Sequence, residues 1–252
     1  MKLLIGLFIF LAVSNSAKLT VHRGKVETTS NYPYMALLSD RKQTSICTGA
    51  LINRNVVMTA AHCTCPSKSP TIVAYFLADN QYDNFKYIAQ AVESFVPVEF
   101  ENVCQKMSQV YRGDVVHALD NSMLIFETDI LRFNPRIRVA RVNYMSRVRD
   151  GLTVRMIGYG RDDSVSFRNS GVLKTGVSRT VACSKDVMQK FNDCICLSTE
   201  NGRVQSPLPG DSGGPLLDAE TGQVIGTVSG GYRNYVLYSR LSLIGSYIAS
   251  YL

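Results

Sequence analysis

A histidine and a serine stand in the two segments of the chain that are best suited to chemistry. His62 lies between Ala61 and Cys63, and its imidazole is the side chain whose ordinary pKa, about 6.5, is nearest to neutrality. Ser212 lies within residues 209–215, which are otherwise mostly Gly and Pro. Small residues let the backbone turn tightly enough for amide N–H groups to converge on one point, where an oxyanion can form. The pair predicts a serine nucleophile served by a histidine base.

Each segment also has a plainer interpretation. Gly, Asp and Ser are common in ordinary turns, so residues 209–215 alone do not establish a nucleophile loop. A single histidine can be a hydrogen-bonded residue of the core with no part in chemistry. Ser212 lies 150 positions after His62 in the sequence. The two interpretations therefore differ in whether the fold brings these residues together.

The elements that must position these residues are predicted to be short strands. Runs rich in Val, Ile, Tyr and Phe recur between Gly, Pro, Asn and Asp residues, a pattern typical of an all-β sandwich or a pair of barrels. One helix is predicted at 242–252, because apolar residues recur there at helical spacing, and we expect it to dock on the body of the protein. An Asn-Pro pair breaks the strand pattern, so a join between two barrels is expected at 133–136.

The N-terminus predicts secretion. Lys2, the apolar residues 3–13 and the small residues 14–17 have the order of a signal peptide, which assigns residues 1–16 to the signal and residues 17–20 to a short propeptide. The apolar stretch is too short to span a bilayer, and no later stretch is long enough. The mature chain is therefore expected to be extracellular, off the membrane, in a compartment that permits disulfides.

Charge and cysteine spacing argue against nucleic acid and metal. The chain of 252 residues has a formal net charge of +7, but its basic residues are scattered, so no nucleic-acid partner is expected. Cys63 and Cys65, and likewise Cys194 and Cys196, follow a C-x-C spacing that is not the usual zinc spacing. With three histidines in the chain, we predict no metal and no cofactor. Seven cysteines is an odd number, so one is expected to have no partner within the chain.

The two segments together carry a specific resemblance. TAAHC at 59–63 and GDSGGP at 210–215, in that order, resemble the chymotrypsin/trypsin-like serine peptidases. The resemblance covers about residues 21–252: residues 31–35 are similar to the family's first strand, Gly158-Tyr159-Gly160 stands where it has Gly-Trp-Gly, and residues 236–241 resemble its last strand. It implies an all-β fold of two six-stranded antiparallel β-barrels, at about 21–135 and 136–241, with a C-terminal helix at 242–252.

The resemblance also implies a third catalytic residue, a carboxylate that orients the imidazole. Asp120 stands where the family has an aspartate followed by a short apolar strand, although Asn121 occupies a normally apolar position. Asp114 and Asp129 are rivals, but neither precedes such a strand. We predict Asp120.

In the mechanism that the family implies, His62 deprotonates Ser212, whose oxygen attacks a peptide carbonyl, and the N–H groups of Gly210 and Ser212 receive the oxyanion. Ser229 matches the serine that supports the aspartate. Residues 229–231 match the strand that pairs with the substrate backbone.

The substrate pocket departs from the family pattern. Ser206 stands at the expected base, where trypsins have Asp, and Gly231 and Val236 form the expected walls. Gly230 replaces the usual tryptophan, and Leu208 replaces a cysteine, so the customary bridge across the pocket is missing. A charged substrate side chain would find no counter-charge at Ser206. We predict a preference for small or medium apolar residues before the scissile bond, as in elastases or chymotrypsins.

Two disulfides, Cys47 with Cys63 and Cys183 with Cys196, match bridges of the family. We pair Cys65 with Cys104 and leave Cys194 as the odd cysteine. Pairing cannot be derived from the sequence alone.

Activation is the weakest part of the resemblance. Family members gain activity when cleavage frees an apolar N-terminus whose ammonium pairs with the aspartate before the nucleophile, here Asp211. Val21 stands at the matching position, but Thr20 precedes it in place of Arg or Lys. Cleavage after Lys18 or after Arg23 would give a different N-terminus, so the processing site stays open.

The sequence therefore predicts a secreted, monomeric serine endopeptidase that acts on protein or peptide substrates and that protein protease inhibitors can bind. A second hypothesis, from another class, is a serine-peptidase homologue without activity that acts as a secreted binding or regulatory protein.

Overall fold

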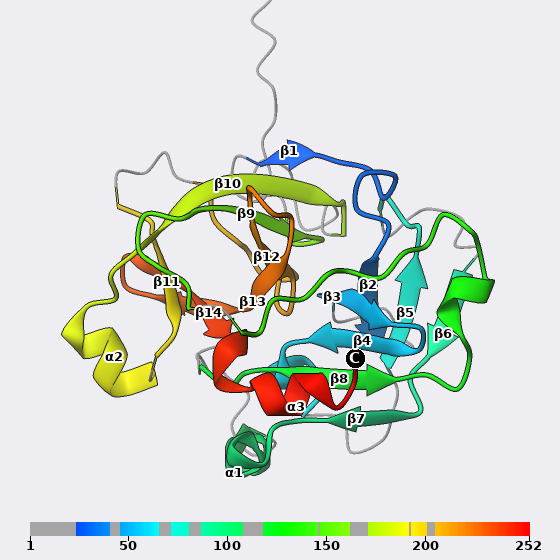
Figure 1. Cartoon of the computed structure of the whole chain (residues 1–252), viewed down its shortest axis with the longest axis horizontal. Helices are drawn as coiled ribbons and strands as arrows, with labels where there is room; N and C mark the ends of the chain where they lie inside the picture. Colours follow the sequence, from blue (N-terminus) through cyan, green and yellow to red (C-terminus); the bar gives the residue numbers. More distant parts are fainter. Residues whose placement is uncertain are drawn as a thin grey trace, which may run out of the picture.

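The computed structural model describes residues 24–40, 46–65, 72–80, 87–107, 118–145, 147–161, 171–191, 193–200 and 205–252. The assigned signal peptide and propeptide, Val21 and Asp114 lie outside the described residues. The described chain forms two seven-stranded sheets, and every strand pairing within them is antiparallel (Figure 1).

The first sheet closes on itself through one bent strand. Its strands are β2 (Met35–Asp40), β3 (Ile46–Asn53), β4 (Val56–Thr59), β5 (Ile72–Phe76), β6 (Tyr87–Gln90), β7 (Glu93–Phe95) and β8 (Ser122–Ile125). β6 pairs with β5 and β7 pairs with β8. Between them, the N–H of Ala91 donates to Ile72 and that of Val92 to Ile125, at 3.0 and 2.8 Å. β6 and β7 thus act as one strand, and the sheet is a six-stranded barrel.

The second sheet is also a six-stranded ring with one strand added outside it. Its strands are β1 (Lys25–Val26), β9 (Thr153–Gly158), β10 (Lys174–Val181), β11 (Ile195–Ser198), β12 (Pro215–Asp218), β13 (Val224–Tyr232) and β14 (Tyr235–Arg240). The pairing of β9 with β10 closes the ring, and β1 extends it by pairing with β10. The expected fold of two antiparallel barrels is confirmed.

Alternation along the central strands of the first barrel builds two cores at once. Ala36 and Leu38 on β2 belong to the cluster inside the barrel, whereas Met35 and Leu37 belong to a cluster that also contains Tyr159 of the second barrel. Successive side chains of a strand point to opposite faces. Because both faces are covered, β4 is buried at all four positions. The turn that carries His62 follows this buried strand directly.

The predicted C-terminal helix is shorter than expected. Residues 242–252 contain the end of a 3-10 turn, η3 (Leu241–Leu243), and the helix α3 (Gly245–Ala249). Its buried face consists of Ile244 and Ile248, and Asn53 of β3 donates to the carbonyl of Tyr251 at 2.8 Å. The 3-10 turn takes the first residues of the predicted range, and the helix ends three residues before the C-terminal Leu252. The helix docks on the body of the protein.

Two helices were not predicted from the sequence, α1 (Val98–Met107) and α2 (Lys185–Phe191). In α1 the side chain of Phe100 is fully buried, and a disulfide from Cys104 to Cys65 ties the helix to the first barrel. Val103 and Cys104 pack in the same cluster as Phe100, so the helix buries a short apolar stripe at positions i, i+3 and i+4. Among the described residues, no helix has the length and apolar character to cross a membrane.

The chain passes from one barrel to the other shortly before Asn143. The N–H of Ala140 donates to Leu51 of the first barrel at 2.7 Å, and the N–H of Asn143 donates to Val224 of the second at 2.8 Å.

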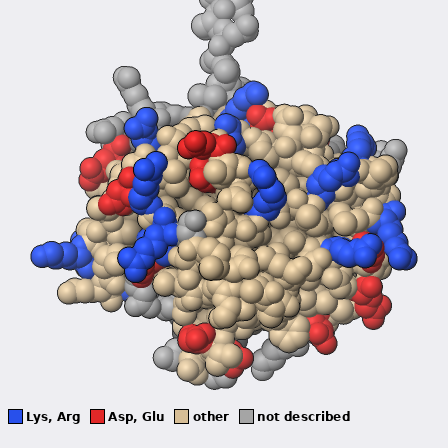
Figure 2. All heavy atoms as spheres, in the orientation of Figure 1, with Lys and Arg blue, Asp and Glu red and all other residues tan. Residues whose placement is uncertain are grey.

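On the face shown in Figure 2, basic side chains are scattered and lie among acidic ones.

Candidate active site

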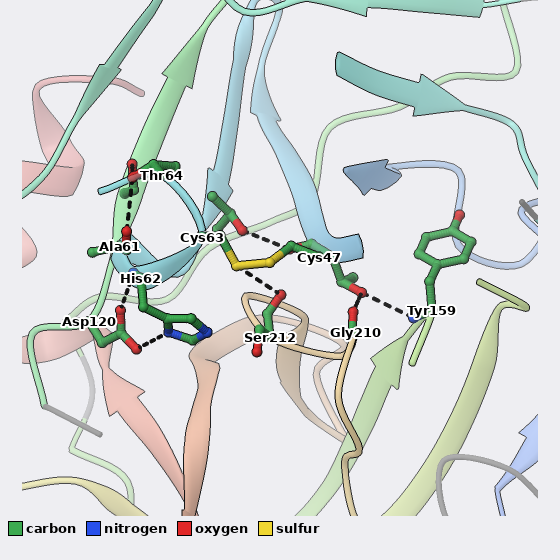
Figure 3. The surroundings of a disulfide bond; sticks show 12 residues. Cys47, Ala61, His62, Cys63, Thr64, Asp120, Tyr159, Gly210 and Ser212 are labelled. Carbon is green, nitrogen blue, oxygen red and sulfur yellow. Dashed lines mark hydrogen bonds and ion pairs between the residues drawn. A yellow bond between two sulfur atoms is a disulfide. The ribbon is translucent and has the colours of Figure 1, made fainter. Parts of the chain in front are cut away.

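His62 lies on a 3-10 turn that follows β4 directly. This turn, η1 (Ala61–Cys63), can pack tightly because Ala60 and Ala61 are fully buried and small. The disulfide from Cys63 to Cys47 on β3 fixes the other end of the turn (Figure 3). The histidine side chain is therefore held on both sides and keeps 18% of its surface exposed.

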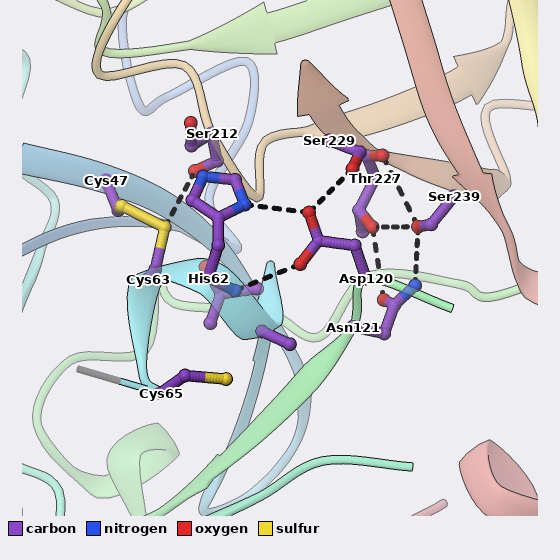
Figure 4. Close-up of polar contacts among 12 residues, drawn as sticks. Cys47, His62, Cys63, Cys65, Asp120, Asn121, Ser212, Thr227, Ser229 and Ser239 are labelled. Atoms are coloured by element: carbon purple, nitrogen blue, oxygen red, sulfur yellow. Dashed lines mark hydrogen bonds and ion pairs between the residues drawn. A yellow bond between two sulfur atoms is a disulfide. The ribbon is translucent and has the colours of Figure 1, made fainter. Parts of the chain in front are cut away.

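The carboxylate of Asp120 fixes the orientation of the His62 imidazole. Its side chain is fully buried, and its carboxylate accepts hydrogen bonds from the His62 N–H at 3.0 Å, from His62 Nδ1 at 2.7 Å and from Ser229 Oγ at 2.6 Å (Figure 4). Three donors compensate the desolvation of a buried carboxylate. Of the two candidate aspartates that the structure describes, Asp120 contacts His62, whereas Asp129 caps η2 (Ile130–Arg132) and binds Arg54.

The hydrogen bond to Asp120 defines the tautomer of His62. A carboxylate only accepts, so Nδ1 carries the proton and Nε2 keeps a free lone pair when the ring is neutral. Burial of the ring disfavours its charged form, but the charge of Asp120 and its hydrogen bond outweigh burial, so the pKa of His62 lies above its ordinary value. In Figures 3 and 4 the ring lies between Asp120 and Ser212.

Ser212 is half-buried on the loop before β12. Among the described residues, no direct hydrogen bond joins its hydroxyl to His62. Catalytic hydrogen bonds are often long before substrate binds and shorten in the complex. The arrangement has the order carboxylate, imidazole, hydroxyl that general-base activation of a serine requires.

The loop before Ser212 leaves two backbone donors available. Within the described chain, the N–H groups of Gly210 and Ser212 make no hydrogen bond to the protein, whereas those of Asp211, Gly213 and Gly214 do. Gly210 has a φ of +101°, and a Cβ there would lie 3.0 Å from the Gly160 Cα. Both the left-handed backbone and the close approach exclude a side chain. Two backbone N–H groups without a protein acceptor could receive an oxyanion.

Gly213 fits this loop against the first barrel. Its φ is +79°, and a Cβ would lie 2.5 Å from both the Ala60 nitrogen and the Thr48 carbonyl oxygen. Real Cβ contacts are never that short, so any side chain would push the nucleophile loop away from His62. The glycine thus determines how closely the two barrels meet at the site.

Thr48 on β3 is a site residue that sequence reasoning missed. Its N–H donates to the Ser212 carbonyl at 2.8 Å, its hydroxyl donates to the Gly210 carbonyl at 2.9 Å, and the same hydroxyl accepts from the Tyr159 N–H at 3.0 Å. One fully buried threonine thus joins the first barrel to the nucleophile loop and to β9. A threonine within a strand gives no sign of such partners, since they lie more than 100 residues away.

Asn121 belongs to a second buried network between the barrels. Its amide donates to Ser239 Oγ at 2.5 Å and its carbonyl oxygen accepts from Thr227 Oγ1 at 3.1 Å, and the two hydroxyls also bond to each other (Figure 4). All three residues are fully buried. The departure noted at Asn121 therefore has a physical reason, because polar partners from β13 and β14 satisfy the amide next to Asp120.

Asp211 is a buried carboxylate directly before Ser212. It accepts the N–H of Gly160 at 2.7 Å and that of Leu208 at 2.8 Å. Burial raises the pKa of Asp211 to about 6, although these two N–H groups and the charge of Lys174 favour the ionised form. Val21, the residue expected to supply an ammonium to this aspartate, lies outside the described residues.

The residues predicted for the substrate pocket come from β13, from β14 and from the segment before the nucleophile loop. Val236 on β14 pairs directly with Gly231 on β13, and its side chain is 6% exposed within the apolar cluster of that barrel. A Cβ on Gly231 would lie at ordinary van der Waals distance, 3.7 Å, from the carbonyl oxygen of Tyr235. Ser206 and Gly230 are half-buried, and Ser229 contacts Asp120 as described above.

The cysteines form the three pairs named from the sequence, and the seventh is buried. The disulfides are Cys47–Cys63, Cys65–Cys104 and Cys183–Cys196. Cys194 is a free thiol, and burial raises its pKa to about 12. A thiol with so high a pKa is a poor nucleophile. Within the described chain, no group of three or more His, Cys, Asp or Glu side chains has the arrangement of a metal site.

Comparison with known proteins agrees with this geometry. The model of the family described as Trypsin matches residues 21–238. The cercarial protease of Schistosoma mansoni is 31% identical over 212 residues, which is 82% of this chain and 77% of that protein. The chymase of Mus musculus is 26% identical over 77% of this chain and 74% of its own length.

Solved structures share the fold at low identity. Human heparin binding protein matches with a TM-score of 0.70 and 16% identity, over 90% of this chain and 94% of that chain. At that identity the likeness shows a shared fold, the arrangement of the two barrels.

Proposed function

The chain belongs to the trypsin family of serine peptidases, and from that premise we propose that it is a secreted serine endopeptidase with His62, Asp120 and Ser212 as its catalytic residues. The observation that carries the proposal is the fully buried Asp120, which holds His62 Nδ1 at 2.7 Å and leaves Nε2 on the side of Ser212. Its substrates would be proteins or peptides, and protein protease inhibitors would compete for the same site.

The proposed reaction has two halves. His62 Nε2 takes the proton of Ser212 Oγ as this oxygen bonds to the substrate carbonyl carbon, and the N–H groups of Gly210 and Ser212 bind the resulting oxyanion. His62 then gives its proton to the departing amine as the C–N bond breaks, which leaves an acyl-enzyme. A water molecule, deprotonated by His62, attacks the ester carbon, and the proton returns to Ser212 as the acid product leaves.

Substrate selection would depend on Ser206, Gly231 and Val236. A neutral Ser206 offers no charge to a lysine or arginine side chain, and burying that charge unpaired is costly. Val236 adds the volume of a branched side chain at the position that pairs with Gly231. We expect cleavage after small or medium apolar residues, and a peptide library that is cut mainly after Arg or Lys would contradict this part of the proposal.

A fluorophosphonate probe tests the catalytic proposal directly, because it reacts with an activated serine. We expect one probe per molecule at Ser212, located by peptide mass analysis, and no labelling in Ser212→Ala. Ser246→Ala, on the exposed side of α3, is the matched control and should label like the parent protein. N-terminal sequencing of secreted protein tests the signal assignment, and its mass in solution tests the monomer.

A second candidate is a binding protein on the same scaffold without hydrolytic activity. The likeness to human heparin binding protein favours it, as does the missing bridge at Leu208. The same probe separates the two candidates, since correctly folded and processed protein that does not label at Ser212 would favour the binding role.

A further inference from the structure

A buried lysine lies beside the nucleophile loop and has no role in the reaction proposed above. Lys174 is the first residue of β10, and its side chain is 2% exposed. Removing an ammonium from water is costly unless a negative group compensates the charge.

The strand register directs Lys174 toward Asp211. Lys174 pairs directly with Gly158 on β9, and directly opposed residues of an antiparallel pair project from the same face with Cβ atoms about 4.5–5.5 Å apart. A Cβ on Gly158 would overlap Oδ1 of Asp211. The lysine stem thus leaves the sheet on the face where the carboxylate lies, and four methylene groups are long enough to carry the ammonium toward it. The charge of Lys174 accordingly lowers the pKa of Asp211.

The carboxylate of Asp211 in turn holds the loop. One oxygen accepts the N–H of Gly160 at 2.7 Å, and the other accepts the N–H of Leu208 at 2.8 Å. Hydrogen bonds to an ionised carboxylate are about twice as strong as neutral ones. Because Asp211 lies between Gly210 and Ser212, its charge state affects both backbone donors that the proposed reaction uses.

We propose that Lys174 is a positioning residue: its ammonium compensates the buried carboxylate of Asp211, and thereby keeps the Gly210 and Ser212 N–H groups in place without an ammonium from a newly cut N-terminus. This inference rests on the proposed function. It makes the secreted chain competent before any cleavage near Val21.

The test uses the full chain as it is secreted, with its N-terminus determined by sequencing and no processing protease added. Lys174→Met removes the charge and keeps an unbranched chain of similar length. We expect the rate constant for fluorophosphonate labelling at Ser212 to fall at least about tenfold, the factor that corresponds to one pKa unit. With a peptide substrate the loss should be in kcat, because the oxyanion donors act in the transition state. Lys174→Arg should retain the labelling.

The matched control is Lys25→Met on the neighbouring strand β1. Lys25 carries the same charge, but its side chain is 79% exposed and binds Glu27, so the variant should label like the parent. A pH profile adds a readout that loss of packing would not move. The ionisable groups that interact with Asp211 include Lys174 on β10 and Tyr238 on β14. Labelling should fail at a higher pH in Lys174→Met than in the parent or in Lys25→Met.

A double variant keeps the test valid if Lys174→Met folds poorly. Lys174→Met with Asp211→Asn removes both charges and so avoids an uncompensated buried carboxylate. If Lys174 acts through Asp211, then Lys174→Met has little further effect on labelling in the Asp211→Asn background. An equal effect in both backgrounds would overturn the proposal.

Three other outcomes are decisive. Equal labelling of the parent and Lys174→Met would overturn the role of Lys174, and so would a parent that labels only after its N-terminus is cut. A parent that never labels, before or after cutting, would instead overturn the proposed peptidase function.

Discussion

The base and the nucleophile of the candidate site are held by different kinds of interaction. His62 is held by side chains: the carboxylate of Asp120, the hydroxyl of Ser229 behind it and the disulfide at Cys63. Ser212 is held by backbone: its carbonyl accepts from the Thr48 N–H, and the glycines beside it pack against the first barrel. The base side can lose a polar group and keep its shape, whereas the nucleophile side has no room for an added atom.

The largest expected effect lies on the base side. Asp120→Asn should preserve the geometry of the site but place the wrong tautomer of His62 next to Ser212. We therefore expect kcat to fall about 10⁴-fold, the loss known for this change in a Ser-His-Asp triad. Asp129→Asn, which changes the rival aspartate, should leave kcat near its parent value. Steady-state hydrolysis of one peptide measures both, and equal losses would show that Asp120 has no special role.

On the nucleophile side, Gly210→Ala tests whether the loop tolerates a methyl group. The added carbon strains a φ of +101° and meets the Gly160 Cα, so the oxyanion donor should move and kcat should fall roughly 10²–10³-fold. Gly151→Ala is the control, since its φ is +77° but nothing lies within 4 Å of the added carbon. If both variants lose the same activity, backbone strain and not the oxyanion donor is responsible.

The network at Asn121 should affect stability more than catalysis. Asn121→Ala leaves Thr227 and Ser239 with fewer partners in a buried place, and the free energy of unfolding should fall by about 1–3 kcal/mol. Asn234→Ala, which breaks an exposed hydrogen bond to Glu200, should change it by less than about 0.5 kcal/mol. Denaturant titration gives both values. An unchanged midpoint for Asn121→Ala would mean that the network does not hold the barrels together.

The smallest effect is a shift in pH dependence. His62 must be neutral to accept a proton, and its pKa lies above the ordinary value because Asp120 outweighs burial. Activity should therefore decline, as pH falls, at a pH above about 6.5. In Asp120→Asn only burial remains, so the midpoint should move to lower pH. The pH profile of kcat/KM is the measurement, and a midpoint that rises in the variant would contradict the assigned cause.

Local sequence predicted the parts of the site that depend on residue type. Ser212 needs a histidine base and small neighbours for its chemistry. Each requirement is visible in a short segment of the sequence, at 59–63 and at 209–215. The resemblance then pointed to Asp120, which the structure indeed places against His62. The roles of Thr48 and Asn121 were not accessible in this way, because each depends on partners from distant strands whose register is not written near the residue itself.

The helices show the same division. The C-terminal helix was predicted from its apolar spacing, but it is shorter than 242–252, since it begins only after the 3-10 turn η3 and ends at Ala249. The helix α1 was missed, although Phe100, Val103 and Cys104 form a short apolar stripe at helical spacing, and a disulfide fixes it to the first barrel.

Residue types along the chain were sufficient to indicate a β-rich protein and the kinds of groups that could react, and they predict a signal peptide. Only the folded structure decided which groups meet: that Asp120 and not Asp129 faces His62, that Thr48 joins the two barrels, and that the buried Lys174 lies on the same side of its sheet as Asp211. The reason is physical. Hydrogen bonds between the two barrels join residues more than 100 positions apart, and the energy of a buried charge depends on those neighbours and not on its place in the sequence.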